Sequence, residues 1–206
     1  MNRCVIIAGA DINNYENAKK YLKDDDFIIC CDCGLRHLQK LNVKPNLIVG
    51  DFDSHKNPHL PVETIVLPCE KDDTDTGFAV KEALKRGAND FLFLGVIGKR
   101  FDHSFANISI LLMLDTLGKS ALAIDDFSEL QIISSQKAFI SDEFSFFSLL
   151  NVSGTAEGIS IKNAKYPLEN AIIKSEDQYG ISNQVLPNQI AEVSIQKGRL
   201  LLIRVK

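Results

Sequence analysis

The stretch Leu47-Ile48-Val49-Gly50-Asp51-Phe52-Asp53-Ser54 is the most informative part of the chain, because an apolar run passes directly into two carboxylates. Leu47–Val49 has the composition of a buried strand, and the residues after it mark that strand's end. In an extended chain residues i and i+2 point to the same side, so Asp51 and Asp53 are expected to face one point. Two anions held so close repel each other unless a cation lies between them, and such oxygen ligands suit Mg²⁺ or Mn²⁺. The stretch therefore predicts half of a metal site, although Gly, Asp and Ser are also ordinary turn residues.

A second acidic segment, Glu70-Lys71-Asp72-Asp73-Thr74-Asp75, follows another apolar run at residues 64–67. Thr74-Asp75 opens a segment with a helical apolar stripe, and the partially positive amino terminus of such a helix suits a phosphate group. We interpret Asp73 as a solvated surface charge. The predicted metal ligands are Asp51, Asp53 and Asp75.

Composition limits the classes of protein that fit this chain of 206 residues, which is 45% hydrophobic with a net charge of −4. The negative charge and the lack of any run of five Lys or Arg residues argue against a nucleic-acid partner. No apolar run approaches the roughly 18 residues of a membrane span, so we expect no membrane partner and a cytoplasmic protein. The five cysteines fit reduced thiols in that compartment, and Cys30, Cys31 and Cys33 lack a matching Cys or His pair for zinc.

Residues 1–126 alternate short apolar runs with segments of helical periodicity. This pattern predicts an α/β domain with a doubly wound, mostly parallel sheet that helices cover on both faces. In open sheets of this kind ligands bind at the carboxyl edge, where the acidic segments fall. The expected strands are 3–8, 27–31, 47–49, 64–67, 91–95 and 121–124, and the expected helices are 13–23, 34–41, 74–86 and 102–117.

Residues 127–206 show short alternating runs with turn residues between them and no sustained helical period. They predict a smaller all-β antiparallel sandwich or barrel domain, with Lys197-Gly198 as its last hairpin turn.

The segment Gly95-Val96-Ile97-Gly98-Lys99-Arg100-Phe101-Asp102-His103 combines a glycine-containing loop, two cations and an Asp-His pair before a helix. Glycines let the backbone approach a phosphate, and Arg100 can hold phosphate oxygens bidentately. Asn107 lies one turn into the same helix. For His103, a structural hydrogen bond at the helix start is an equally good interpretation.

These motifs together resemble the thiamine pyrophosphokinase family over nearly the full chain. Cys33 and Ile181 depart mildly from the family pattern, which has glycine at the first position and a small or hydroxyl residue at the second. The shared patterns are Asp-x-Gly at 32–34, Pro-Asn at 45–46, Gly-Asp-Phe-Asp-Ser at 50–54, Lys-Asp-x-Thr-Asp at 71–75, Gly-x-x-Gly-x-Arg-x-Asp-His at 95–103 with Asn107, and Gly-x-Ser-Asn at 180–183.

The resemblance implies transfer of the pyrophosphoryl group of ATP to the hydroxyl of thiamine, which gives thiamine diphosphate and AMP. It also implies Mg²⁺ as cofactor, a homodimer, a catalytic domain at residues 1–126 and a thiamine-binding and dimerisation domain at residues 127–206. Either Asp75 or Asp72 would accept the proton of the substrate hydroxyl. The implied catalytic residues are Asp51, Asp53, Asp75, Asp72 and Arg100; the implied nucleotide-binding residues are Asp32, Gly34, Thr74, Gly98, Arg100, Asp102, His103 and Asn107; and the implied thiamine-binding residues are Ser182, Asn183 and Tyr166.

Two alternative functions remain compatible with the sequence. A related pyrophosphokinase that acts on a hydroxymethyl pterin would use the same chemistry, and a non-catalytic nucleotide or thiamine sensor could have the same fold. The turns that contain Tyr166 and Ser182 could also be plain connections between strands.

Overall fold

The computed structural model describes residues 2–53, 59–70, 72–177 and 179–206. They form two compact units, Met1–Asp126 and Phe127–Lys206. Ser54 and Lys71, which belong to the predicted motifs, lie outside the described residues.

The first unit contains a parallel sheet with the strand order β4-β3-β2-β1-β5-β6. All of these neighbouring strands pair in parallel. The order reverses direction at the β1 and β5 pair, which confirms the predicted doubly wound sheet. The interior strands are buried almost throughout, as their continuous apolar runs predict. The strands are β1 (Arg3–Ile7), β2 (Phe27–Cys31), β3 (Leu47–Gly50), β4 (Glu63–Val66), β5 (Asp90–Leu94) and β6 (Ser120–Ile124).

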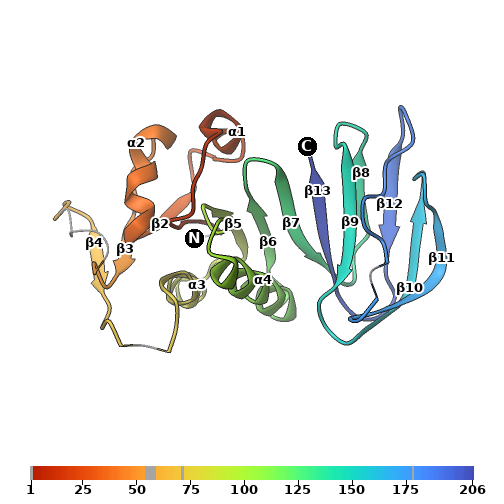
Figure 1. Cartoon of the computed structure of the whole chain (residues 1–206). Coiled ribbons are helices and arrows are strands. Elements are labelled where there is room, and N and C mark those ends of the chain that lie inside the picture. The colour runs from red at the N-terminus through yellow and green to blue at the C-terminus, as the bar shows by residue number, and fades with distance from the viewer. Residues whose placement is uncertain (1, 54–58, 71, 178) are drawn as a thin grey trace. The chain divides into compact units, whose positions relative to one another are not determined.

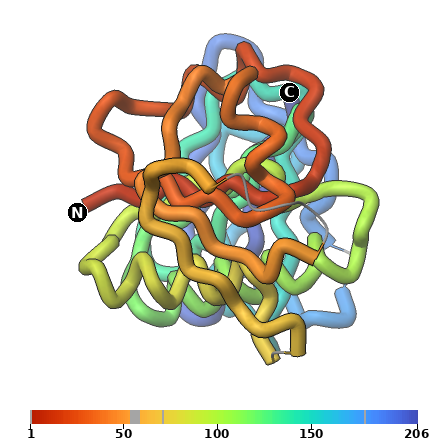
Figure 2. The backbone as a smooth tube through the Cα atoms, turned by 90° about the vertical axis from the view of Figure 1, so that its left-hand side faces the viewer, coloured from red at the N-terminus to blue at the C-terminus, as the bar shows by residue number. Residues whose placement is uncertain are grey.

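Helical segments cover both faces of this sheet (Figure 1). Figure 2 shows these helical segments in a view turned by 90°, with the red and orange segments on one face of the sheet and the yellow-green helices on the other. No helix within the described ranges combines the length and apolarity needed to cross a bilayer. The segments are α1 (Tyr15–Lys19), the 3-10 helix η1 (Asp32–His37), α2 (Leu38–Leu41), α3 (Asp75–Lys85) and α4 (Phe101–Thr116).

Helix α1 ends at Lys19, earlier than the predicted helix 13–23, and it begins later because side chains fix the chain before Tyr15. The Asp126 carboxylate accepts hydrogen bonds from the backbone N–H groups of Asn13 and Asn14 at 2.8–3.0 Å. The Asn14 side chain in turn accepts from the backbone of Asn17 at 3.0 Å and caps the helix.

Helix α3 begins where the sequence predicts. The Thr74 hydroxyl accepts a hydrogen bond from the Gly77 N–H at 3.1 Å, and this N-cap bond places Asp75 in the first turn. The buried face of α3 contains Ala79, Val80 and Ala83, which are fully buried. The start of this helix is therefore fixed at the carboxyl edge of the sheet.

The second unit is an antiparallel β-sandwich, as predicted (Figure 1). One layer has the order β7-β13-β9 and the other has the order β11-β10-β12-β8. Side chains of both layers, among them Phe147, Ile159 and Leu202, form one core cluster. The strands are β7 (Ser128–Ile133), β8 (Ala138–Ser141), β9 (Phe146–Asn151), β10 (Thr155–Lys162), β11 (Leu168–Lys174), β12 (Ile190–Ser194) and β13 (Leu200–Val205).

The prediction that Lys197-Gly198 closes a hairpin is wrong. Strand β12 pairs with β10 and β8, whereas β13 pairs with β7 and β9. The turn therefore crosses from one layer to the other. It is held there because the N–H and C=O of Glu157 bond to the backbone of Lys197.

Candidate functional site

A cavity of about 500 Å³ opens at the carboxyl edge of the parallel sheet. Its walls come from the segments that follow β1, β2, β3 and β5 and from the first turns of α3 and α4. The volume is in the range of small-molecule sites, and the position is where open α/β sheets bind ligands.

Three carboxylates converge in this cavity. Asp32 begins η1, Asp51 follows β3, and Asp75 begins α3, and one oxygen of each lies within 4.8 Å of the others. The approach of Asp32 depends on Gly50, because a Cβ at that position would lie 2.5 Å from the Asp32 Cβ. Three carboxylate oxygens suit a hard cation such as Mg²⁺, whose ligands lie about 2.1 Å from it. The chemistry of this donor set therefore fits the predicted metal.

Asp53 does not belong to this cluster among the described acidic residues, although it lines the cavity. The expectation that the chain is extended from Asp51 to Asp53 is wrong, because β3 ends at Gly50 and Phe52 has a left-handed φ of 57°. The backbone N–H of Asp53 instead donates to Asp51 Oδ1 at 3.3 Å, across a turn. Asp53 as a metal ligand stays a prediction, and Asp32, predicted to bind nucleotide, takes the third place in the cluster.

Arg100 lines the cavity and is held by a bidentate pair with Asp102. The Nε–Oδ1 and Nη2–Oδ2 distances are 3.0 and 2.7 Å. The side-chain hydrogen bond from Arg100 keeps the pKa of Asp102 well below its ordinary value. Asp102 is not among the described residues that line the cavity, so it orients Arg100 from outside.

Hydrogen bonds within the loop after β5 involve two more predicted residues. Asn107 is buried, and its Nδ2 donates to the Val96 carbonyl at 2.7 Å. The Gly98 N–H donates to the Ser104 hydroxyl at 3.0 Å, so this N–H is already used inside the protein. Asn107 and Ser104 therefore shape the loop, and the sequence analysis missed Ser104. His103 lines the cavity beside them.

Gly34 has a packing reason that is separate from any ligand. A Cβ at this position would lie 2.3 Å from the backbone oxygen of Ile7. The glycine lets η1 approach β1 closely, and Asp32 lies in the same 3-10 helix.

The acidic segment before α3 divides into two groups. Thr74 and Asp75 line the cavity, whereas Asp72 is exposed and is not among its described lining residues. Asp73 pairs with Lys81 of α3 at 2.5 Å, as a surface charge would. Of the two candidate proton acceptors, only Asp75 lies on the cavity.

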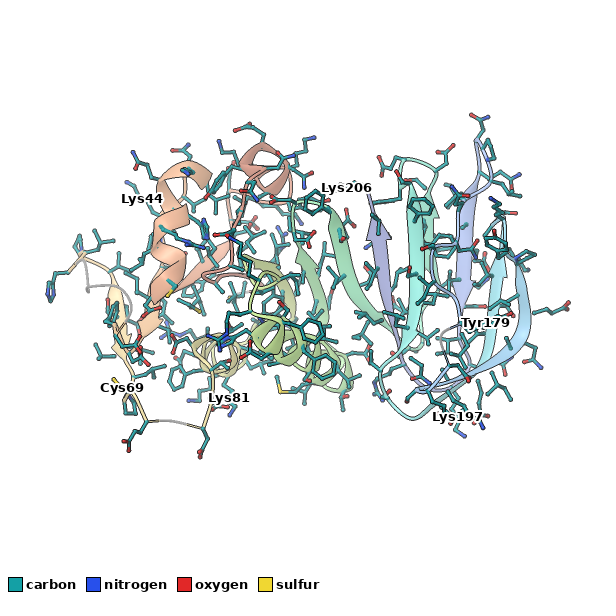
Figure 3. The ribbon with its side chains drawn as sticks, viewed as in Figure 1. Lys44, Cys69, Lys81, Tyr179, Lys197 and Lys206 are labelled. Carbon is teal, nitrogen blue, oxygen red and sulfur yellow. The ribbon has the colours of Figure 1, made fainter. Side chains whose placement is uncertain are left out.

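In the second unit, the segment Gly180–Asn183 extends along the edge of β9. It follows Tyr179, which Figure 3 labels. The Gly180 carbonyl accepts from the Leu149 N–H at 2.8 Å, and Asn183 and Phe147 exchange backbone hydrogen bonds at 2.8 and 2.9 Å. Ser182 is exposed, has a left-handed φ of 57°, and donates its N–H to the Ser148 hydroxyl at 3.0 Å.

The Asn183 side chain has a structural role. It is 3% exposed, and its Oδ1 accepts from the N–H groups of Tyr166 and Gln184 at 3.0 and 2.9 Å. Its Nδ2 donates to the Tyr166 carbonyl at 2.7 Å. Asn183 therefore ties the Tyr166 turn to the Ser182 segment, and the exposed side chains of Tyr166 and Ser182 remain accessible to a ligand.

The five cysteines are free. Burial raises the pKa of Cys4 to about 12 and that of Cys31 well above its ordinary value. Both side chains are protonated at neutral pH, which suits a packing role better than metal binding.

Three more charged residues line the same cavity, Asp11, Arg36 and Lys99, and the sequence led to no role for any of them, although Lys99 is one of the two cations of the 95–103 segment. All three lie in segments that follow strands of the parallel sheet, where the rule for open sheets predicts a ligand. Their mutual contacts, however, join residues that are far apart in the chain.

The fold and the cavity define the class of the protein: an α/β unit with an acidic cavity at the carboxyl edge of its parallel sheet, followed by a separate β-sandwich unit. Within that class the chain belongs to the thiamin pyrophosphokinase family. The family model for the thiamin pyrophosphokinase catalytic domain matches residues 18–122, and the model for the thiamin pyrophosphokinase vitamin B1 binding domain matches residues 132–200.

Similar proteins cover the whole chain. Thiamine pyrophosphokinase from Bacillus subtilis is 26% identical over 207 residues, which cover 97% of this chain and 96% of the relative. A crystal structure of thiamine pyrophosphokinase from Bacillus subtilis has a TM-score of 0.87 at 24% identity and covers 100% of this chain and 99% of its own. Thiamin pyrophosphokinase from Candida albicans has a TM-score of 0.75 at 18% identity and covers 100% of this chain and 89% of its own. The two structures support the shared fold.

Proposed function

We propose that this protein transfers the pyrophosphoryl group of ATP to the hydroxyl of thiamine and so forms thiamine diphosphate and AMP. The observation that carries the proposal is the carboxylate cluster of Asp32, Asp51 and Asp75 in the cavity of the unit that matches the catalytic-domain model. The match of the second unit to a vitamin B1 binding domain supports thiamine as the acceptor.

Asp32, Asp51 and Asp75 would hold Mg²⁺ or Mn²⁺, with Asp53 as a further candidate from the same loop as Asp51. When bound, such an ion supplies positive charge that neutralises phosphate oxygens and the leaving group.

Residues of the chain bind the phosphate groups and accept the proton of the substrate hydroxyl. Arg100, oriented by its pair with Asp102, can donate two hydrogen bonds to phosphate oxygens. The amino terminus of α3, capped by Thr74, adds a partial positive charge beside Asp75. The hydroxyl oxygen of thiamine attacks the β-phosphorus, the bond from that phosphorus to the bridging oxygen breaks, and AMP leaves with that oxygen. Asp75 is the better placed of the two candidate acceptors for the hydroxyl proton, because it lies on the cavity.

Thiamine binding is assigned to the second unit. Ser182 and Tyr166 present exposed side chains, and Asn183 fixes their turns. The alternatives, a pterin pyrophosphokinase or a sensor, are less well supported, because a matched vitamin B1 binding domain and an acidic cluster of three carboxylates favour an enzyme that acts on thiamine.

A homodimer in the cytoplasm completes the proposal. The five free cysteines suit a reducing compartment. The molar mass in solution, measured by light scattering against the 22.9 kDa of one chain, tests the dimer.

The reaction is tested by AMP release from ATP and Mg²⁺ with and without thiamine, with EDTA as the control. We expect AMP that depends on thiamine and disappears with EDTA. Release of ADP would indicate a simple kinase, and release of AMP with a hydroxymethyl pterin instead of thiamine would support the related enzyme.

A further inference from the structure

Asp11 bridges two cations on the wall of the cavity. Its Oδ1 accepts a hydrogen bond from Arg36 Nη2 at 2.9 Å, and its Oδ2 lies 3.0 Å from Lys99 Nζ. Asp11 follows β1, Arg36 belongs to η1, and Lys99 follows β5, so the bridge joins segments after three different strands. Lys99 first and then Arg36 lower the pKa of Asp11, which therefore carries its negative charge at neutral pH.

The two cations are held to different degrees. The Arg36 Nη2 also donates to the Gly9 carbonyl, in addition to its bond to Asp11. These two bonds hold the guanidinium against the wall of the cavity. The Lys99 side chain is 92% exposed, and the structure gives it the Asp11 ion pair. Exposed ion pairs of this kind are weak, so a more highly charged anion can take the place of the carboxylate.

The charge of the cavity makes these cations relevant to a nucleotide. Its described lining carries the carboxylates Asp11, Asp32, Asp51, Asp53 and Asp75 against the permanent cations Arg36, Lys99 and Arg100. Arg100 gives its Nε and Nη2 to Asp102, so only its remaining N–H groups are available to phosphate oxygens. A triphosphate needs positive charge along its whole length. Arg36 and Lys99 provide it on the wall that Asp11 shares.

We propose that Arg36 and Lys99 form a phosphate-binding pair for the nucleotide, and that the Asp11 carboxylate holds both cations in place until phosphate oxygens replace it. The inference rests on the proposed function in taking ATP as the ligand. A purely structural bridge would also contain these contacts, but the loss of any one of its three residues would then change ATP binding in the same direction. In the phosphate-binding arrangement Asp11 competes with the ligand, so its loss and the loss of a cation have opposite effects.

The experiment measures binding of ATP with Mg²⁺ by titration calorimetry, without thiamine, at two salt concentrations. The variants are Arg36→Gln, Lys99→Gln and Asp11→Asn, each of which removes one charge. We expect the Kd to rise about 10-fold for Arg36→Gln and several-fold for Lys99→Gln, with a weaker dependence on salt in both. For Asp11→Asn we expect an unchanged or lower Kd. Lys19→Gln is the matched control, because Lys19 forms an exposed pair with Glu16 away from the cavity and should bind like the wild type.

Three outcomes overturn the inference. A Kd that rises equally in all three variants would show that the bridge is only structural. Wild-type affinity in both Arg36→Gln and Lys99→Gln would show that these cations do not bind phosphate. A wild-type protein that binds no ATP would show that ATP is not the ligand. Arg36→Gln also loses the contact to Gly9, so Lys99→Gln, on an exposed side chain, keeps the test valid if the former fails to fold. Failure of the proposed reaction is seen separately: wild-type protein would then bind ATP in this assay and release no AMP with thiamine.

Discussion

The candidate residues of the two units differ in what surrounds their polar groups. In the first unit three carboxylates converge with oxygens within 4.8 Å of one another, a concentration of like charge that favours the folded state only when a cation joins it. In the second unit the buried amide of Asn183 has neutral partners for both of its polar atoms. Clustered charge of the first kind points to a ligand, whereas satisfied hydrogen bonds of the second kind stabilise the fold. Substitutions in the carboxylate cluster should therefore affect turnover, and substitution of Asn183 should affect stability.

The largest expected effect is that of Asp51→Asn. The variant removes one carboxylate from the cluster, and we expect turnover, measured as AMP release dependent on thiamine, to fall about 1000-fold, since the metal contributes several kcal/mol to the transition state. The melting temperature of the metal-free protein should stay the same or rise, because one of three repelling charges is gone. An Asp51→Asn variant that melts much lower and turns over normally would show that Asp51 stabilises the fold and does not bind the metal.

Asp53→Asn sharpens the same contrast. Its carboxylate lines the cavity outside the described cluster, so we expect a loss of about 100-fold, smaller than that of Asp51→Asn. The measurement is again AMP release, titrated with Mg²⁺. Equal losses in the two variants would restore Asp53 to the ligand set that the sequence predicts, and wild-type turnover would remove it.

Much of the α/β unit was predictable because its physical causes are local. A buried parallel strand is a continuous apolar run, as at residues 27–31, and a helix start has a capping residue, as at Thr74. The shape of the acidic loop was not predictable, because a left-handed φ at Phe52 has no signal in a residue of that type. The place of Asp32 in the cluster depends on tertiary packing against Gly50. The layer change at Lys197-Gly198 likewise depends on long-range strand pairing.

Asn183→Ala tests the structural side of the comparison. The variant leaves the N–H groups of Tyr166 and Gln184 and the Tyr166 carbonyl without the bonds that Asn183 makes. Unsatisfied buried groups cost about 1–3 kcal/mol each, and water can reach part of this turn, so we expect a loss of about 3 kcal/mol in the free energy of unfolding. Urea denaturation measures it.

Ser182→Ala is the matched variant on the neighbouring residue. The hydrogen bond of Ser182 to Ser148 uses its backbone N–H and survives the substitution, so the free energy of unfolding should change by less than about 0.5 kcal/mol. We expect the KM for thiamine to rise more than the KM for ATP. A large loss of stability here, or a larger change in the KM for ATP, would contradict the assignment of Ser182 to thiamine.

The smallest effect concerns His37, a buried polar group of the first unit that resembles Asn183 in being satisfied. Its ring bonds to the Tyr15 hydroxyl at 2.7 Å and to the Ala10 carbonyl at 2.9 Å, and the latter bond assigns the proton to Nε2. Burial, and then the charge of Arg36, lower its pKa below the ordinary value of 6.5. The unfolded chain therefore binds a proton more readily than the folded one, and stability falls as the pH drops below about 6.5 until the folded pKa is passed. Denaturation at several pH values should show this decline in the wild type and a shallower one in His37→Gln. Identical slopes would mean that other groups cause it.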